Sequence, residues 1–143
     1  MISRRSGAIL NVSSSAGFLP IPVFNVYAAT KAYVTSFTES LRAEVRGAGI
    51  TVTALCPGPL HTEFQKQAQR PGEKPDSARS PVYVSVEQVV RDALAAIESN
   101  KPLVIPGTIM KLAMFLARLT PMWILRMAWR FGAKRVKQKR RSM

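Results

Sequence analysis

Residues 7–13, Gly-Ala-Ile-Leu-Asn-Val-Ser, form a short apolar run that is almost unbroken by polar side chains. A run without polar alternation is typical of a strand that is covered on both faces, as in a parallel sheet. Residues 50–56, Ile-Thr-Val-Thr-Ala-Leu-Cys, form a second candidate strand, rich in β-branched side chains and ended by Pro57 and Gly58. Residues 102–107 suggest a third, brief strand. The sequence therefore predicts a parallel sheet of about three strands.

Two helices are expected between these strands. From about residue 25 to residue 46 there is neither glycine nor proline, and apolar side chains recur at helical spacing until Gly47 and Gly49. Residues 86–100 repeat the pattern, and Ser85 followed by Gln88 has the spacing of an N-terminal cap. Strands that alternate with helices indicate an α/β fold.

Composition narrows the class of protein. The chain has 143 residues, enough for one domain of ordinary size, and a formal net charge of +13. Residues 1–100 contain 10 basic and 8 acidic side chains, whereas residues 101–143 contain 11 basic side chains and no acidic one. Because the excess belongs to the C-terminal part alone, we expect no nucleic-acid partner.

Cysteine and histidine are nearly absent. A single cysteine, Cys56, cannot form a disulfide within the chain, and one histidine, His61, cannot complete a structural zinc site. We therefore expect no metal and a cytoplasmic location. Cys56, at a strand end, is expected to be a small buried apolar residue.

The residues with chemical potential lie in the first third of the chain. Ser13, Ser14 and Ser15 close the first strand, and Tyr27 and Lys31 stand four positions apart on the long helix, which places them on one helix face. Ligands of open α/β sheets bind beyond the carboxyl ends of the strands. We therefore expect the three residue types to converge there.

Such a set suits proton transfer. A phenol has an ordinary pKa near 10, which is too high for efficient exchange near pH 7. An ammonium about 4 Å away stabilises the phenolate by roughly 4 kcal/mol at an effective dielectric constant of about 20. That energy is about sufficient to lower the pKa of the phenol to near 7. A nearby hydroxyl could hold a carbonyl oxygen. The bland alternative is an exposed tyrosine beside a solvated lysine.

Three motifs together resemble the short-chain dehydrogenase/reductase family: residues 11–17 (Asn-Val-Ser-Ser-Ser-Ala-Gly), 27–31 (Tyr-Ala-Ala-Thr-Lys) and 56–62 (Cys-Pro-Gly-Pro-Leu-His-Thr). The resemblance covers about residues 7–107. It implies a Rossmann-like, doubly wound parallel sheet and an oxidoreductase that moves hydride between NAD or NADP and a carbonyl or alcohol.

The resemblance also implies roles for individual residues. Tyr27 would be the catalytic acid/base, Lys31 would lower its pKa and bind the nicotinamide ribose, and Ser14, 13 positions before the tyrosine, would be the catalytic serine. The implied cofactor contacts are Tyr27, Lys31, Pro57, Gly58, Leu60 and Thr62. Ser13 and Ser15 are expected to satisfy backbone groups at the turn. The family forms homo-oligomers, partly through the long helix.

One departure from the family pattern is large. The sequence contains no glycine-rich phosphate loop of the TGxxxGxG kind, no Asn-Asn-Ala-Gly segment and no residue that would select the adenosine ribose. We interpret residues 1–107 as a partial, C-terminal half of a Rossmann-like catalytic domain. Alone, this chain is expected to bind the dinucleotide weakly and to be nearly inactive.

Residues 108–143 form a separate tail in this interpretation. Residues 109–131 mix aliphatic, methionine and tryptophan side chains with four cations and are broken by Pro121, and a polybasic end follows. The pattern suits an amphipathic segment on an anionic membrane surface with a disordered basic end, so peripheral membrane contact is expected. A helix that caps the substrate pocket is an equal alternative. Two functional hypotheses follow from these alternatives. The first is an oxidoreductase with a lipid-like substrate, and the second is a non-catalytic membrane-associated or regulatory fragment.

Overall fold

The computed structural model describes residues 1–22, 24–60 and 83–130. His61, Thr62, residues 63–82 and the basic end of the tail lie outside these residues. Three strands form one sheet, in which β1 (Gly7–Val12) pairs with β2 (Ile50–Leu55) and β2 pairs with β3 (Leu103–Val104). Both pairings are parallel, with Gly7 opposite Ile50 and Ala54 opposite Leu103. The predicted α/β fold with about three parallel strands is confirmed.

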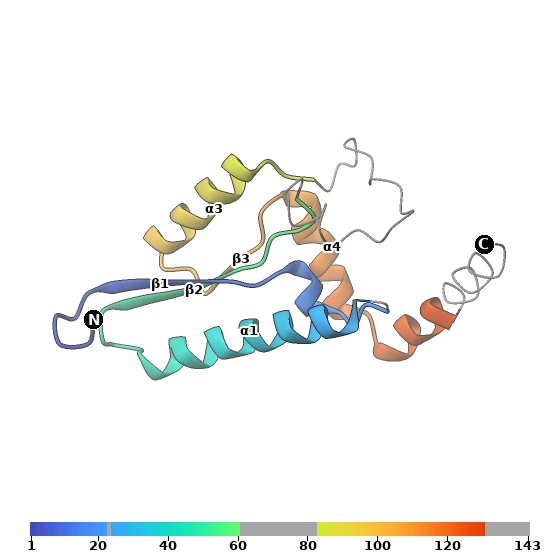
Figure 1. Cartoon of the computed structure of the whole chain (residues 1–143), viewed down its shortest axis with the longest axis horizontal. Coiled ribbons are helices and arrows are strands. Elements are labelled where there is room, and N and C mark those ends of the chain that lie inside the picture. The colour runs from blue at the N-terminus through green and yellow to red at the C-terminus, as the bar shows by residue number, and fades with distance from the viewer. Residues whose placement is uncertain (23, 61–82, 131–143) are drawn as a thin grey trace.

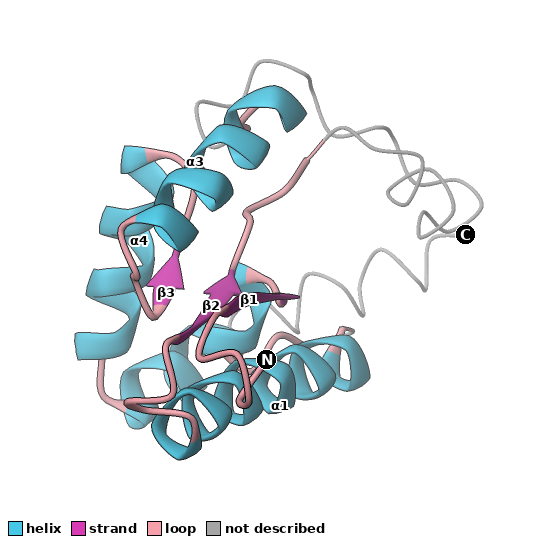
Figure 2. Ribbon diagram, turned by 90° about the vertical axis from the view of Figure 1, so that its left-hand side faces the viewer, coloured by secondary structure: helices cyan, strands magenta, loops and turns pink. Residues whose placement is uncertain are grey.

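Helices cover both faces of this sheet. Figure 1 shows α1 (Asn25–Glu44) along one face and α3 (Val86–Glu98) along the other, and Figure 2 shows the same layers from the side. The Ser85 hydroxyl accepts a hydrogen bond from the Gln88 amide at 3.2 Å, which is the predicted cap of α3. After α1 the chain turns through Gly47, whose φ of +84° lies in the left-handed region that glycine adopts at least cost.

The third strand is shorter than predicted. The sequence suggested residues 102–107, but only Leu103 and Val104 form β3. Pro102 and Pro106 flank this pair, and proline has no amide hydrogen to donate to a neighbouring strand. Pro102 still accepts a hydrogen bond from the Ala54 amide through its carbonyl, at 2.8 Å.

The two faces of the sheet are held differently. Toward α3 the core is aliphatic, and its buried members are Leu55, Val89, Ala93, Ala96 and Val104. Toward α1 the contacts include polar groups: the Asn11 amide donates to the Thr38 hydroxyl at 3.1 Å, and Arg42 donates to the Val52 carbonyl at 2.8 Å. Because these polar groups are bonded, burying them against α1 costs little.

Candidate functional site

The end of β1 is joined to α1 by Ser13. Its hydroxyl, which is buried, donates to the backbone carbonyl of Lys31 at 2.7 Å and lies 2.7 Å from the Thr35 hydroxyl. We expected Ser13 to satisfy backbone groups of its own turn. Instead it binds the helix, because the last residues of β1 run beside the Lys31 turn of α1.

Ser14 begins a short 3₁₀ helix, η1 (Ser15–Phe18). Its hydroxyl oxygen accepts a hydrogen bond from the Ala16 amide at 3.1 Å, and the side chain is mostly buried. A serine hydroxyl has one donor and two acceptor positions, so this cap occupies only one acceptor. The Ser15 amide donates to the Pro57 carbonyl at 2.9 Å, which fixes the turn against the segment after β2.

Lys31 is held at both ends by β1. Its Nζ donates to the Val12 carbonyl at 3.0 Å, while its own carbonyl accepts from Ser13. The same Nζ lies 5.7 Å from the centroid of the Tyr27 ring, so the two side chains are neighbours on one face of α1. The ammonium is therefore fixed beside the phenol ring at the carboxyl end of β1.

Glycine is required where η1 meets α1. A Cβ on Gly17 would lie 2.8 Å from the Ala32 nitrogen and 2.8 Å from the Lys31 carbonyl carbon. These are backbone atoms that cannot move aside without shifting the helix. Any larger residue at position 17 would push η1, and with it Ser14, away from the Lys31 turn.

The segment after β2 supplies the other residues expected at the site. Pro57 is buried and Leu60 packs against the aliphatic core beneath α3. A Cβ on Gly58 would lie 2.6 Å from Cε of Met110, so the absence of a side chain here makes room for α4 (Thr108–Leu119). Thr62 lies outside the described residues.

Thr35 is a positioning residue that the sequence motifs did not single out. It bonds the Ser13 hydroxyl, the Lys31 carbonyl at 3.1 Å and, more weakly, the Cys56 sulfur at 3.9 Å. Its place four residues after Lys31, on the same helix face, was the available signal. Burial raises the pKa of the Cys56 thiol, and hydrogen bonds from Thr35 and Ser13 oppose that rise. Cys56 is fully buried, as expected.

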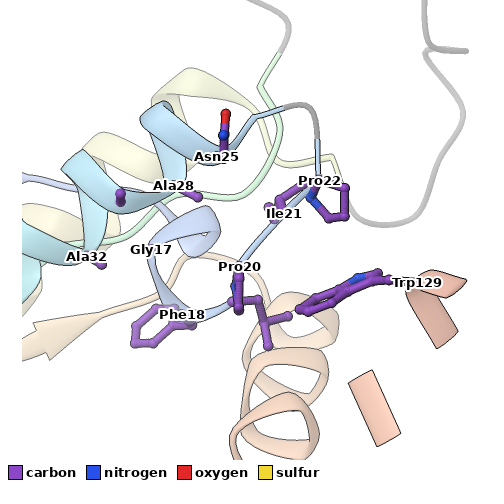
Figure 3. A pocket seen from close by; sticks show the side chains of 11 residues that line it. Gly17, Phe18, Pro20, Ile21, Pro22, Asn25, Ala28, Ala32 and Trp129 are labelled. Carbon is purple, nitrogen blue, oxygen red and sulfur yellow. The ribbon is translucent and has the colours of Figure 1, made fainter. Parts of the chain in front are cut away.

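An apolar pocket of about 490 Å³ lies beside η1 (Figure 3). Phe18, Pro20 and Ile21 form one side, and α1 contributes Ala28 from the opposite side. Trp129, from the C-terminal part of the chain, points toward Pro20 and also lines the pocket. Residues close to Ser14 and Tyr27 in sequence therefore share this pocket with the C-terminal segment.

Sequence comparisons identify relatives of the chain. A model of the short chain dehydrogenase family matches residues 1–72. The mouse protein named very-long-chain 3-oxoacyl-CoA reductase is 37% identical over 89 residues, which are 62% of this chain and 28% of that protein. The bovine protein named dehydrogenase/reductase SDR family member 7B is 33% identical over 99% of this chain and 44% of its own length. The chain thus spans less than half the length of these curated relatives.

Comparison with solved structures agrees. A short-chain dehydrogenase from Sphingobium yanoikuyae, solved in complex with NADPH, superimposes with a TM-score of 0.64 at 26% sequence identity. The match covers 93% of this chain and 46% of that one. The sheet, the flanking helices and the sequence match over the first half of the chain lead to one conclusion: the chain belongs to the short-chain dehydrogenase family.

Proposed function

We propose that this chain carries the proton-transfer site of an NAD(P)-dependent oxidoreductase that interconverts a carbonyl and an alcohol. The observation that carries the proposal is the Lys31 ammonium, fixed by the Val12 carbonyl at 3.0 Å and placed 5.7 Å from the centre of the Tyr27 ring. Tyr27 would be the catalytic acid/base. Ser14, at the neighbouring turn, would hold the substrate oxygen.

The residues present fit the nicotinamide end of such a cofactor. A lysine ammonium has three N–H donors, and the bond to Val12 uses one, which leaves donors for ribose hydroxyls. The backbone of residues 57–60 lies at the same edge of the sheet, where dinucleotides bind in open α/β folds. The structural relative from Sphingobium yanoikuyae was solved with NADPH, and one from Burkholderia cenocepacia with NADP. The bound cofactor would supply or accept the hydride.

In the reducing direction, the Ser14 hydroxyl donates a hydrogen bond to the carbonyl oxygen of the substrate. As the carbonyl carbon gains hydride, the Tyr27 hydroxyl transfers its proton to that oxygen, and the alcohol forms. The Lys31 ammonium stabilises the phenolate that remains until solvent returns the proton. Oxidation of an alcohol follows the same steps in reverse.

The apolar pocket supports a substrate with an apolar, lipid-like substituent. Its lining is almost wholly aliphatic and aromatic, and Ala28 and Asn25, which line it, flank Tyr27 in α1. Relatives are named for acyl-CoA and steroid substrates: very-long-chain 3-oxoacyl-CoA reductase and 17-beta-hydroxysteroid dehydrogenase type 3. We propose a ketone of this apolar class as the substrate.

We further propose that residues 1–143 alone turn over slowly and bind the dinucleotide weakly. In the described sheet β1 pairs only with β2, so its other edge has no partner strand, and edge strands of parallel sheets are poorly protected. A cytoplasmic or membrane-peripheral location stays a prediction.

Replacement of the phenol tests the activity. Oxidation of NADPH by a panel of 3-oxoacyl-CoA and steroid ketones is followed with the 143-residue chain and with a longer protein that contains it. Tyr27→Phe should lower the rate of the active form by about 10²- to 10⁴-fold, the usual contribution of a general acid. Tyr33→Phe is the matched control, because Tyr33 is 68% exposed on the same helix and stacks on Phe37. Equal rates for the two variants would remove Tyr27 from the mechanism.

The second hypothesis, a non-catalytic fragment, predicts a different result. In that case neither form of the protein oxidises NADPH with any ketone of the panel, and Tyr27→Phe changes nothing. A fluorescence measurement then separates a loss of activity from a loss of cofactor binding. If NADPH quenches the protein fluorescence and Lys31→Met abolishes that quenching, the chain still has a cofactor site. No quenching in either form would reject the proposed function.

A further inference from the structure

Helix α4 has two apolar faces, of which only one is covered by the protein. Met110 is buried, and Met114 and Ala117 are partly buried on the same side. The other face is exposed and follows helical spacing of three and four residues; its members are Ile109, Leu112, Phe115, Leu116 and Leu119. A second apolar face of this size, on a helix whose first face is already packed, indicates a further contact.

Cations border this uncovered face. Lys111 and Arg118 are seven positions apart, so they lie on one side of α4, next to the exposed apolar residues. Both are exposed, and the Arg118 guanidinium lies 5.7 Å from the centre of the Phe18 ring of η1. No aspartate or glutamate occurs in the sequence after Glu98. The border of the apolar face therefore carries positive charge only.

The next helix, Met122–Arg130, has the same character. It is bent by 105° from α4, and its exposed apolar side chains include Met122, Trp123 and Met127. Arg126 and Arg130 are exposed as well. Tryptophan beside arginine is typical of segments at the boundary between lipid acyl chains and headgroups. Both helices thus carry exposed apolar and cationic side chains, which together we call the C-terminal surface (residues 108–130).

We propose that the C-terminal surface lies on an anionic lipid membrane, with the exposed face of α4 inserted among the acyl chains and its cations at the headgroup phosphates. Charge decides between the candidate occupants. A second copy docked through the same face would bring the same cations face to face, and the sequence after Glu98 has no acidic residue to balance them. An anionic bilayer offers both an apolar layer and negative charge at its surface.

Helix length bears on whether the chain lies on the membrane or crosses it. Among the described residues, no single helix is long and apolar enough to span a bilayer; α4 and Met122–Arg130 pass the test only as a bent pair. At 12 residues, α4 is about 18 Å long, against a hydrocarbon layer of about 30 Å. An orientation along the surface uses the exposed face without carrying the cations through the acyl layer.

The surface also adjoins the apolar pocket. Trp129 of the second helix and Phe18 of η1 both line that pocket (Figure 3). The Arg118 guanidinium of α4 lies over the Phe18 ring. A membrane-bound C-terminal surface would therefore hold the pocket next to the lipid phase. This consequence rests on the proposed function, whereas membrane binding itself does not.

Flotation with vesicles tests the proposal on the 143-residue chain, because vesicles rise in a density gradient and aggregated protein sinks. The chain should float with vesicles of phosphatidylcholine and phosphatidylserine, much less with phosphatidylcholine alone, and be released by high salt. The double variant Leu112→Gln and Leu116→Gln should bind at least about tenfold more weakly. Lys111→Glu with Arg118→Glu should do the same and remove the preference for phosphatidylserine.

A matched pair on α3 controls for a general loss of apolar surface. Leu94 and Leu116 are each 54% exposed, and Val90 is one turn from Leu94. Val90→Gln with Leu94→Gln should leave flotation unchanged. Circular dichroism should show equal helix content in all variants.

Three outcomes would overturn the proposal. Equal loss in the α3 and α4 pairs would mean that any apolar surface suffices. Binding that resists high salt and needs detergent for release would mean that the chain spans the bilayer. Self-association in the absence of lipid that Leu112→Gln and Leu116→Gln abolish, without flotation of the original chain, would make a second copy the occupant. None of these outcomes depends on catalytic activity, so failure here leaves the oxidoreductase proposal standing.

Discussion

Strand β2 and helix α4 are both rich in apolar residues, but they differ in what covers those residues. In β2, Val52, Ala54 and Leu55 are buried between α1 and α3. In α4, five large apolar side chains remain exposed although the helix buries Met110. The difference shows that an apolar pattern predicts a contact without saying whether this chain supplies it. For β2 the partners are elements of the same fold, whereas the described residues leave one face of α4 uncovered.

The polar groups of the two regions also differ in what they contact. Around β2, hydroxyl and guanidinium groups bind backbone carbonyls of neighbouring elements: Ser13 binds α1, Thr53 binds the carbonyl before β3, and Arg42 binds β2. In α4 the cations Lys111 and Arg118 are exposed, and the Arg118 guanidinium lies over the face of the Phe18 ring. The first arrangement stabilises the fold, and the second leaves charge at the surface.

The largest expected effect comes from truncating one aliphatic side chain in each region. Val52 is 0% exposed and Leu112 is 59% exposed. Val52→Ala should lower the free energy of unfolding by about 2 kcal/mol, because it removes buried methyl groups and leaves a cavity. Leu112→Ala should change it by less than about 0.5 kcal/mol, since its side chain already meets solvent. Urea unfolding followed by circular dichroism measures both.

A loss in Leu112→Ala as large as that in Val52→Ala would break the comparison. It would mean that α4 is covered in solution by another part of the chain. Repeating both measurements with phosphatidylserine vesicles sharpens the result, because a ligand that binds only the folded chain adds to its stability. Leu112→Ala should gain less from the vesicles than the unaltered protein does.

A smaller effect is expected from removing one arginine in each region. The Arg42 guanidinium donates to the Val52 carbonyl at 2.8 Å and to the Asn100 carbonyl at 2.7 Å, so it joins α1 to the sheet and to the turn before β3. Arg42→Met keeps much of the aliphatic stem and should cost about 1–2 kcal/mol of unfolding free energy. Arg118→Met loses an exposed cation–π contact and should cost at most about 0.5–1 kcal/mol. Equal costs would show that the two cations have equivalent surroundings.

Sequence reasoning located the elements better than it located the contacts between them. The unbroken apolar runs predicted β1 and β2 within one residue of their observed ends, and the stretch free of glycine and proline predicted α1, which ends at Glu44 rather than near residue 46. These features depend on local periodicity. The roles of Thr35 and Arg42 depend on contacts with residues 10 or more positions away in the sequence. The pattern of a single helix does not reveal such contacts and predicts only a solvated polar side chain at each position.

The same limit applies to the candidate site. Tyr27 and Lys31 are neighbours because they are four apart on one helix, which the sequence alone indicates. The bonds that hold Lys31 to Val12 and Ser13 join residues 18 and 19 positions apart, and no motif specified them. Gly58 is expected by resemblance to contact a cofactor, which stays a prediction, and the structure adds that Cε of Met110 lies 2.6 Å from where its Cβ would be.

The smallest effect concerns Cys56, which follows β2 and has no counterpart in α4. Burial raises the pKa of its thiol above the ordinary value of about 8.5, so the unfolded chain ionises at a lower pH than the folded one. The stability that this difference contributes is complete below about pH 8.5 and is lost as pH rises toward the folded pKa, with a slope of at most about 1.4 kcal/mol per pH unit. Other groups also titrate there, so the measured quantity is the difference between the original chain and Cys56→Ala in urea unfolding at pH 7 and at higher pH.

Alkylation compares the two regions directly. Iodoacetamide reacts with thiolates, so native Cys56, fully buried and bonded to Thr35, should react far more slowly than the same thiol in urea. In a Cys56→Ala background, Leu116→Cys should react in the native protein nearly as fast as in urea, because position 116 is exposed. Phosphatidylserine vesicles should then slow the reaction at position 116 while leaving Cys56 unaffected, since only the α4 face is expected to enter lipid. Protection of position 116 without vesicles would place a protein contact there and contradict the exposed face on which the membrane proposal depends.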